Sequence, residues 1–392
     1  MAVARGAGSA ASSIDAARAR RVLDALAPAI VYLLVRLAGV GVLAAMAAHD
    51  GASLLGELTS WDGRWLLAIA EHGYDGVPAD MVDATGHRSP ETPLGFFPGY
   101  PGLVAAARLL TGGNLVAAGL LVSTAAGIAA AFGLTRLGES VPGGSRRAGL
   151  LLTCLFAASP MAVALSMTYT EALFCALAVW VLVGVLREQW MLAGLCAAGA
   201  GLVRPTGSSL VAAVGLAALA AVIQRRGGWR PWVAGALAAA GALGYVGYVA
   251  TRTGVLGGWF VIQREGWGWH LDGGVATVRW LAEVLTSSGN VFDLLTVLSL
   301  AGSIALFVVA VIMRMPWPLL VYGGLVLVTT WGTDGLMNAK LRVLLPAFVL
   351  LLPVAIGLAA RRRATAVAVV VAAAFASAWF GAYALTIWPY AI

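Results

Sequence analysis

Two carboxylates, Asp62 and Glu171, and three cations, Arg204, Lys340 and Arg342, are the residues in this sequence best suited to chemistry. A carboxylate can take the proton of a hydroxyl group, and a guanidinium is a strong partner for a phosphate. Each of the five stands beside an apolar run, and polar groups in or near a lipid bilayer are costly to retain. We therefore treat them as candidates for a functional site.

The first carboxylate belongs to the polar segment 60–74, which reads SWDGRWLLAIAEHGY. Apolar residues at positions 65, 66, 69 and 70 predict a short amphipathic helix that begins at Asp62 and lies on the membrane surface. Trp61 and Trp65 suit the depth of lipid headgroups. The alternative is that Asp62 only caps this helix and that the two tryptophans only form an aromatic belt.

The other four candidates have equally plain alternatives. Glu171 either points into an outer cavity or closes a capping box with Thr168. Arg204 precedes a proline at a predicted helix junction, where it either binds a phosphate or extends to lipid headgroups. The same two interpretations apply to Lys340 and Arg342.

A further polar segment, 263–272 with the sequence QREGWGWHLD, combines aromatic side chains with a carboxylate and an imidazole. This combination suits stacking and hydrogen bonding with a sugar, although an interfacial tryptophan belt would look the same. The candidate substrate-binding residues from all these segments are Trp61, Arg64, His72, Tyr74, Tyr169, Arg264, Trp269, His270 and Asp272.

The composition identifies the elements that must position these residues. The chain has 392 residues, of which 60% are hydrophobic and 11% are charged, whereas soluble domains average about 25% charged residues. Apolar runs near the ~20 residues that cross a bilayer recur from about Ala27 onward. We expect an all-α, polytopic membrane protein with about eleven transmembrane helices: a flexible cytoplasmic N-terminus at 1–26 and a single transmembrane domain at 27–392.

The distribution of charge gives the expected orientation. The net charge of +7 comes from short basic clusters between apolar runs, which is the positive-inside pattern and argues against nucleic-acid binding. The large loops 49–95 and 252–290 then face away from the cytoplasm. Residues 96–112 begin with two prolines and two glycines and are predicted to form a juxtamembrane or re-entrant helix in the first outer loop.

Several kinds of site are not indicated. The three cysteines lie in apolar segments without metal-ligand spacing, and the four histidines are scattered. There is no P-loop and no dinucleotide fingerprint, so we expect neither a metal nor another cofactor. The candidates cluster at the outer surface, whereas a transporter usually places its binding groups near the midplane of the membrane.

Four motifs in this order resemble the PIG-V family, the second mannosyltransferases of GPI-anchor synthesis, in a shorter bacterial form. They are WDGRWLLAIAEHGY at 61–74, FFPGYP at 96–101, SP at 159–160 with YTEALF at 169–174, and RPTG at 204–207. The family's arginine motif usually reads more like RSNG, so Pro205 and Thr206 depart from it.

The resemblance implies a GT-C glycosyltransferase in the plasma (inner) membrane whose site faces away from the cytoplasm. Such enzymes use a polyprenyl-phosphate sugar, commonly mannose, and typically invert the anomeric centre. By this analogy Asp62 is the catalytic carboxylate. Glu171 would orient the acceptor, while Arg204, supported by Lys340 or Arg342, would stabilise the leaving phosphate.

The expected substrates are polyprenyl-phosphate-mannose as donor and a lipid or glycolipid as acceptor, which would yield an α-mannoside. Three alternatives remain open. One is a transporter or flippase for a lipid-linked saccharide, and another is a membrane scaffold without catalysis. The third is an enzyme of the same fold that uses another polyprenyl-linked sugar, such as arabinofuranose or glucose.

Overall fold

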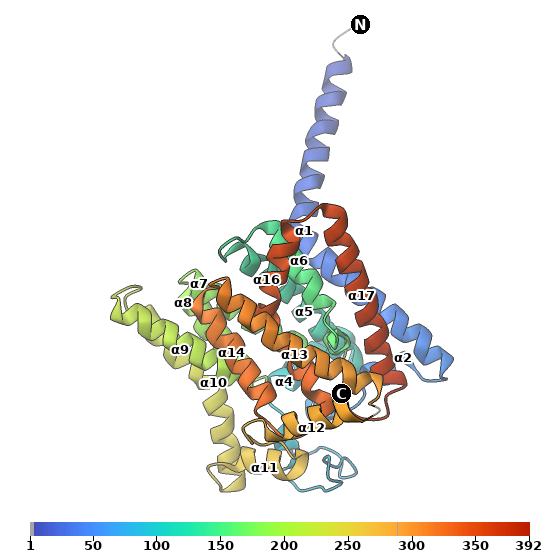
Figure 1. Cartoon of the computed structure of the whole chain (residues 1–392), viewed down its shortest axis with the longest axis vertical. Helices are drawn as coiled ribbons and strands as arrows, with labels where there is room; N and C mark the ends of the chain where they lie inside the picture. Colours follow the sequence, from blue (N-terminus) through green and yellow to red (C-terminus); the bar gives the residue numbers. More distant parts are fainter. Residues whose placement is uncertain (1–3, 288) are drawn as a thin grey trace.

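The computed structural model describes residues 4–287 and 289–392, with side chains from Arg20 onward. The regular secondary structure of this part is helical, with turns and loops between the helices, and its one β contact is an isolated antiparallel bridge between Leu271 and Thr333. Figure 1 shows long helices packed side by side, with short helices and loops gathered at one end around α11 and α12. The predicted flexible segment 1–26 lies largely outside the described side chains and stays a prediction.

Five helices are long and apolar enough to cross a bilayer. They are α1 (Ala4–His49), α5 (Leu115–Glu139), α10 (Arg230–Thr253), α13 (Val291–Ile312) and α17 (Arg363–Thr386). A sixth span is possible where two segments, Met337–Val343 and Leu345–Ala359, join at a bend of 53°. The chain is therefore a multi-pass membrane protein, whereas the predicted count of eleven spans is not confirmed.

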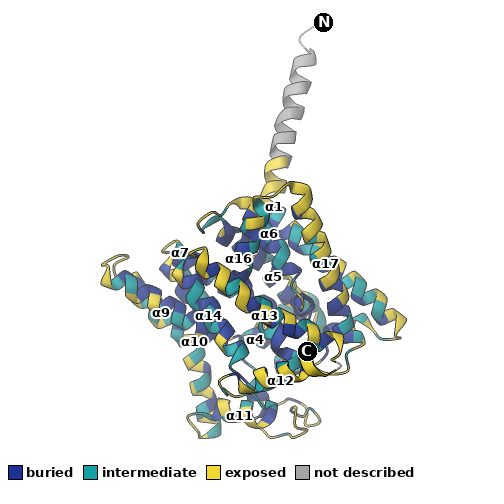
Figure 2. Cartoon of the chain, in the orientation of Figure 1, coloured by how far each residue is buried: buried dark blue, intermediate teal, exposed yellow. Residues whose placement is uncertain are grey.

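Shorter helices pack among and beside these spans. They are α6 (Arg146–Ala157), α7 (Glu171–Leu186), α8 (Trp190–Gly201), α9 (Gly207–Ile223), α14 (Trp317–Trp331) and α16 (Leu352–Ala359). Most residues of α7 are buried, because this helix packs against α5 on one side and α8 on another. Figure 2 shows exposed residues along α13 and α17 instead. Exposed Val371 and Phe375 of α17 suit contact with lipid.

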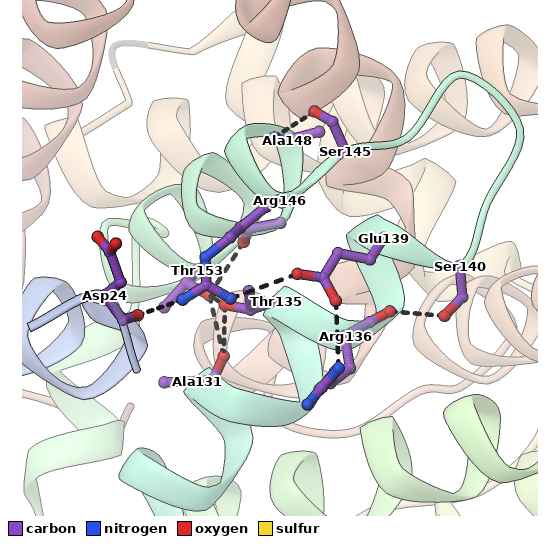
Figure 3. A network of polar contacts seen from close by, with 11 residues as sticks. Asp24, Ala131, Thr135, Arg136, Glu139, Ser140, Ser145, Arg146, Ala148 and Thr153 are labelled. Atoms are coloured by element: carbon purple, nitrogen blue, oxygen red, sulfur yellow. Dashed lines mark hydrogen bonds and ion pairs between the residues drawn. The ribbon is translucent and has the colours of Figure 1, made fainter. Parts of the chain in front are cut away.

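An arginine-rich end of the bundle is formed by the turns at 140–145, 187–189, 224–229, 313–316 and 360–362. Figure 3 shows part of it: Arg146 of α6 contacts Glu139 of α5 at 3.4 Å and donates to the backbone carbonyl of Asp24 in α1. Arg136 lies 3.6 Å from the same glutamate. These contacts tie α1, α5 and α6 together where positive-inside charge is expected.

The opposite end carries the two large predicted loops, which contain short helices. The first loop holds α2 (Leu54–Leu58), α3 (Asp62–His72) and η1 (Thr92–Gly95), and the second holds α11 (Gly258–Trp267) and α12 (Val275–Thr286). The amphipathic helix predicted to begin at Asp62 is thus confirmed as α3. Residues 96–112 form α4 (Gly99–Ala107) and η2 (Arg108–Thr111), which are too short to cross a bilayer of ~30 Å.

Three further short helices complete the bundle on the side away from the arginine-rich end. They are η3 (Ala162–Ser166) before α7, and η4 (Met337–Ala339) with α15 (Lys340–Val343) before η5 (Leu345–Leu351). Because α7 and α16 both end near arginines, their N-terminal sides face the loop-bearing end. The fold therefore brings the starts of α3, α7 and α15 and the α8–α9 turn to the same side of the bundle.

Candidate active site

Asp62 is the first residue of α3 and follows a strained turn. The amide of Gly63 donates to the carbonyl of Ser60 at 3.0 Å, which places Trp61 at φ 53° and ψ −120°, a conformation normally reserved for glycine. The Asp62 carboxylate accepts a hydrogen bond from Arg342, and its side chain remains 33% exposed. Since this carboxylate pairs with an arginine 280 positions away, it does more than cap its own helix.

Arg342 in α15 bridges the two site carboxylates. Its Nη1 contacts Asp62, and its Nε lies 3.5 Å from Oε1 of Glu171. The guanidinium also lies 5.0 Å from the centre of the Tyr169 ring, within the range of a cation–π contact. Only 11% of the side chain is exposed, so its charge is largely shielded from water.

Glu171 opens α7 and is completely buried, and its second partner is Arg204. The Arg204 guanidinium donates to the Glu171 carboxylate and, at 3.2 Å, to the hydroxyl of Thr170. The capping box proposed from the sequence is not formed, because Thr168 directs its hydroxyl to the carbonyl of Leu58 at 3.5 Å.

The four charges alternate in the order Asp62, Arg342, Glu171, Arg204, and we refer to these residues as the charge cluster. Two carboxylates and two guanidiniums make the charge cluster neutral, which limits the cost of burying it. The sequence named all four residues, and the fold brings them together.

The segment before α7 is held to the Asp62 turn through the backbone. The amide of Thr168 donates to the carbonyl of Leu58 at 3.0 Å. Gly63 fits tightly here, because a Cβ at this position would lie 2.6 Å from the Thr168 hydroxyl. Ser123 of α5 donates to the carbonyl of Met167 at 2.7 Å from the other side. These contacts fix Tyr169 and Glu171 relative to Asp62.

Tyr169 lies beside the charge cluster and is fully buried. Burial, together with the nearby Asp62 carboxylate, raises the pKa of the Tyr169 hydroxyl well above its usual value. The hydroxyl therefore stays protonated, and it has no hydrogen-bond partner within the described residues. Its ring is the part that touches the charge cluster, through Arg342.

The FFPGYP motif supports the turn that carries Arg204. The amide of Gly99 donates to the carbonyl of Leu202 at 2.7 Å, and a Cβ on residue 99 would lie 2.8 Å from that oxygen. Glycine is thus required by this close approach. Tyr100 donates to the carbonyl of Gly119 at 2.9 Å and anchors the start of α4 to α5.

Tyr74 also has a positioning role in the same loop. Its hydroxyl donates to the carbonyl of Phe96 at 2.8 Å, and Tyr245 of α10 donates to the same carbonyl at 2.6 Å. Burial raises the pKa of Tyr74, which keeps the hydroxyl in its donating form. Gln263 of α11 contacts the neighbouring carbonyl of Gly95 at 2.9 Å. The second outer loop thereby supports the first.

Lys340 is not brought to the charge cluster. Its ammonium donates to the carbonyls of Thr330 and Thr333, both at 2.7 Å, and the residue is buried. These bonds close the end of α14 onto the start of α15. The structure therefore gives Lys340 contacts that fix the segment bearing Arg342, and the predicted phosphate contact of Lys340 stays a prediction.

The candidates in segment 264–272 lie around a separate pocket. A cavity of about 260 Å³ is lined by apolar residues together with Arg264, Trp269 and His270. Asp272 instead caps α12, accepting from the amides of Gly274 at 2.8 Å and Ala276 at 2.6 Å. These backbone bonds lower the pKa of Asp272 below its usual value.

The remaining candidates lie on the surface of α3 and its flanks. Trp61 and Arg64 are exposed, and exposed His72 lies 3.6 Å from Glu71. Within the described residues, no hydrogen bond or ion pair joins these three side chains to the charge cluster, and Trp61 is only a neighbour of Asp62 in the chain. Their predicted contacts with substrate stay predictions.

Sequence reasoning missed two residues. Thr170 donates toward Glu171 at 3.4 Å and accepts from Arg204, a role that no local pattern signals. Arg36 is buried within α1 and donates to the Ser166 hydroxyl at 3.0 Å and the Ala157 carbonyl at 2.7 Å. A charge inside an apolar run is a signal that could have found it.

No metal centre is evident in the described part of the chain, where no group of three or more histidine, cysteine or carboxylate side chains could hold an ion. The arrangement offers a partly exposed carboxylate, a buried carboxylate and two arginines. Such a set can accept a proton at one point and bind an anion nearby.

Comparisons with known proteins give one kind of match. Neither the protein-family models nor the curated proteins match this sequence. Among solved structures, the chain is similar to ArnT from Cupriavidus metallidurans bound to undecaprenyl phosphate, with 15% sequence identity and a TM-score of 0.53. The match covers 88% of this chain and 61% of ArnT, so the chain spans less than two thirds of ArnT's length. The predicted all-α GT-C fold is thereby confirmed.

Proposed function

We propose that this chain is a glycosyltransferase that transfers a sugar from a polyprenyl phosphate to a lipid or glycolipid acceptor. The observation that carries the proposal is the Asp62 carboxylate, which is partly exposed, held by Arg342 and placed on the side of a GT-C fold away from the arginine-rich end. The similar structure, ArnT, was solved with undecaprenyl phosphate bound, which supports a lipid-linked donor.

The proposed donor is polyprenyl-phosphate-mannose, and the proposed product is an α-mannoside formed with inversion. The PIG-V-like motifs support this choice, since three of them supply Asp62, Glu171 and Arg204 to the charge cluster. Positive-inside charge supports placing the site at the extracytoplasmic face of the plasma membrane. An arabinofuranosyl or glucosyl donor would use the same carboxylate and lipid phosphate.

The proposed reaction is a single displacement. Asp62 takes the proton of the acceptor hydroxyl while that oxygen forms a bond to the anomeric carbon. The bond from this carbon to the phosphate oxygen breaks, and polyprenyl phosphate leaves with the electron pair. Arg204 is placed to stabilise the charge that develops on the phosphate, and Glu171 keeps Arg204 in position.

The test is the transfer of radiolabelled mannose from polyprenyl-phosphate-mannose in membranes that contain wild type or Asp62→Asn, with a mixed lipid extract as acceptor. We expect the variant to lose about 10²- to 10⁴-fold in rate, because it lacks the base. Glu71→Gln is the matched control, since this exposed carboxylate lies on the same helix and its ion pair, at 3.6 Å, is with His72.

Each result of this assay separates the alternatives. Label that persists in Asp62→Asn at equal expression would remove Asp62 from the mechanism. If wild type transfers no mannose, the assay is repeated with other polyprenyl-linked sugars. Movement of a lipid-linked sugar across the membrane without any transfer would favour the flippase instead.

A further inference from the structure

Arg342 has the contacts of a residue that serves Asp62 rather than a substrate. Its Nη1 is bonded to Asp62 and its Nε faces Glu171 at 3.5 Å, so two of its three nitrogens point to protein carboxylates. A guanidinium has a rigid fork of donors, and once it faces two carboxylates it has little freedom to turn toward a third anion.

Two neighbours fix the position of Arg342. The ring of Tyr169 faces the guanidinium, with its centre 5.0 Å away. Lys340, two residues earlier, anchors the start of α15 to the carbonyls of Thr330 and Thr333. Side-chain positions that are locked by neighbours in this way preorganise a site before substrate arrives.

The arrangement of charges around Asp62 leaves Arg342 as the cation that pairs with it. Glu171 on α7 is the like charge that faces the pair, but Arg204 from the α8–α9 turn neutralises it. Tyr169 is uncharged. Arg64 lies on the same helix as Asp62, and its charge interacts with the carboxylate of Glu57 in α2. Arg342 is therefore the one cation within the described residues that forms an ion pair with Asp62.

We infer that Arg342 is the positioning residue of Asp62: it aims the carboxylate at the acceptor, and it does not hold the donor phosphate. This inference rests on the proposed function. It replaces the sequence-based expectation that Arg342 is a phosphate ligand, and it leaves Arg204 as the arginine of the charge cluster for that role.

The inference predicts that kcat and the donor KM respond differently to the loss of Arg342. In Arg342→Gln the Asp62 carboxylate loses the ion pair that orients it, so kcat should fall by about 10- to 100-fold. The KM for the donor should change less than about threefold, because phosphate contacts are retained.

Two variants keep this test sharp. Arg342→Lys retains the charge but not the fork, so it should recover part of the lost kcat. Arg226→Gln is the control, since Arg226 is exposed and pairs with Glu188 at the arginine-rich end. A donor KM raised by about tenfold or more in Arg342→Gln, with kcat unchanged, would overturn the inference.

A measurement without activity separates this inference from the proposed function. The probe is undecaprenyl phosphate, whose binding to the purified protein is measured in one detergent. We expect Arg342→Gln to bind it within about threefold of wild type, and Arg204→Gln to bind it about tenfold more weakly or worse. Loss of binding in Arg342→Gln would refute the inference, whether or not the protein transfers sugar.

Discussion

Replacing Glu171 by Gln tests whether the charge cluster is held together by its internal ion pairs. The substitution keeps the shape of the side chain but leaves Arg204 and Arg342 with Asp62 as the one remaining carboxylate, so the charge of the charge cluster rises from zero to +1. Removing one partner of a buried pair costs about 3–5 kcal/mol. We take the lower value, about 3 kcal/mol, because both arginines keep some contact with solvent.

This free energy converts to a measurable change in melting temperature. An unfolding entropy of about 2.1 cal/mol/K per residue gives roughly 0.8 kcal/mol/K for 392 residues. A loss of about 3 kcal/mol then lowers Tm by about 4 °C. The assay is thermal unfolding in one detergent, followed by intrinsic tryptophan fluorescence.

The double variant Glu171→Gln with Arg204→Gln supplies the decisive comparison. It restores neutrality, and the two amides can hydrogen-bond to one another, so most of the lost stability should return. A single variant within about 1 °C of wild type would refute the reasoning, because the pair would then contribute little. So would a double variant that melts below the single one.

Two further predictions concern the surroundings of the site. Gly63→Ala should reduce both activity and stability, the latter by about 1–3 kcal/mol, because the new Cβ meets the Thr168 hydroxyl at 2.6 Å. Adding Thr168→Ala should recover much of the loss, and failure to do so in a transfer assay would argue against this steric cause. The pKa of Asp272 is lowered in the fold by the amides of Ala276 and Gly274, so its contribution to stability is present above the unfolded value of about 3.9 and is lost as pH falls below it. The protection of the amides at the start of α12, taken relative to their intrinsic exchange rates at each pH, should fall over that window in wild type and stay constant in Asp272→Asn.

Local pattern was sufficient to predict α3 and the residues of the charge cluster. The apolar spacing after Asp62 defines a helix that lies on a surface, and the cost of polar groups beside apolar runs points to Glu171 and Arg204. These patterns involve residues that are close together in the sequence, so they can be recognised without knowledge of the fold.

The ion pairs that these residues form could not be predicted in the same way. Asp62 and Arg342 are 280 positions apart, and which cation pairs with which carboxylate depends on how α7, α15 and the α8–α9 turn pack. Lys340 illustrates the limit: by sequence it equals Arg342 as a phosphate ligand, yet its ammonium is taken by two backbone carbonyls. The predicted count of eleven spans is not confirmed for a related reason, since short apolar helices resemble spans in hydropathy.

The separation of Asp62 and Arg342 in the chain has a consequence for how the protein is made. Asp62 leaves the ribosome 280 residues before its ion-pair partner, with most of the bundle still to be inserted. Until α15 reaches the membrane, the Asp62 carboxylate lacks its ion-pair partner. Assembly of the charge cluster is therefore completed only when one of the last helices of the chain is inserted.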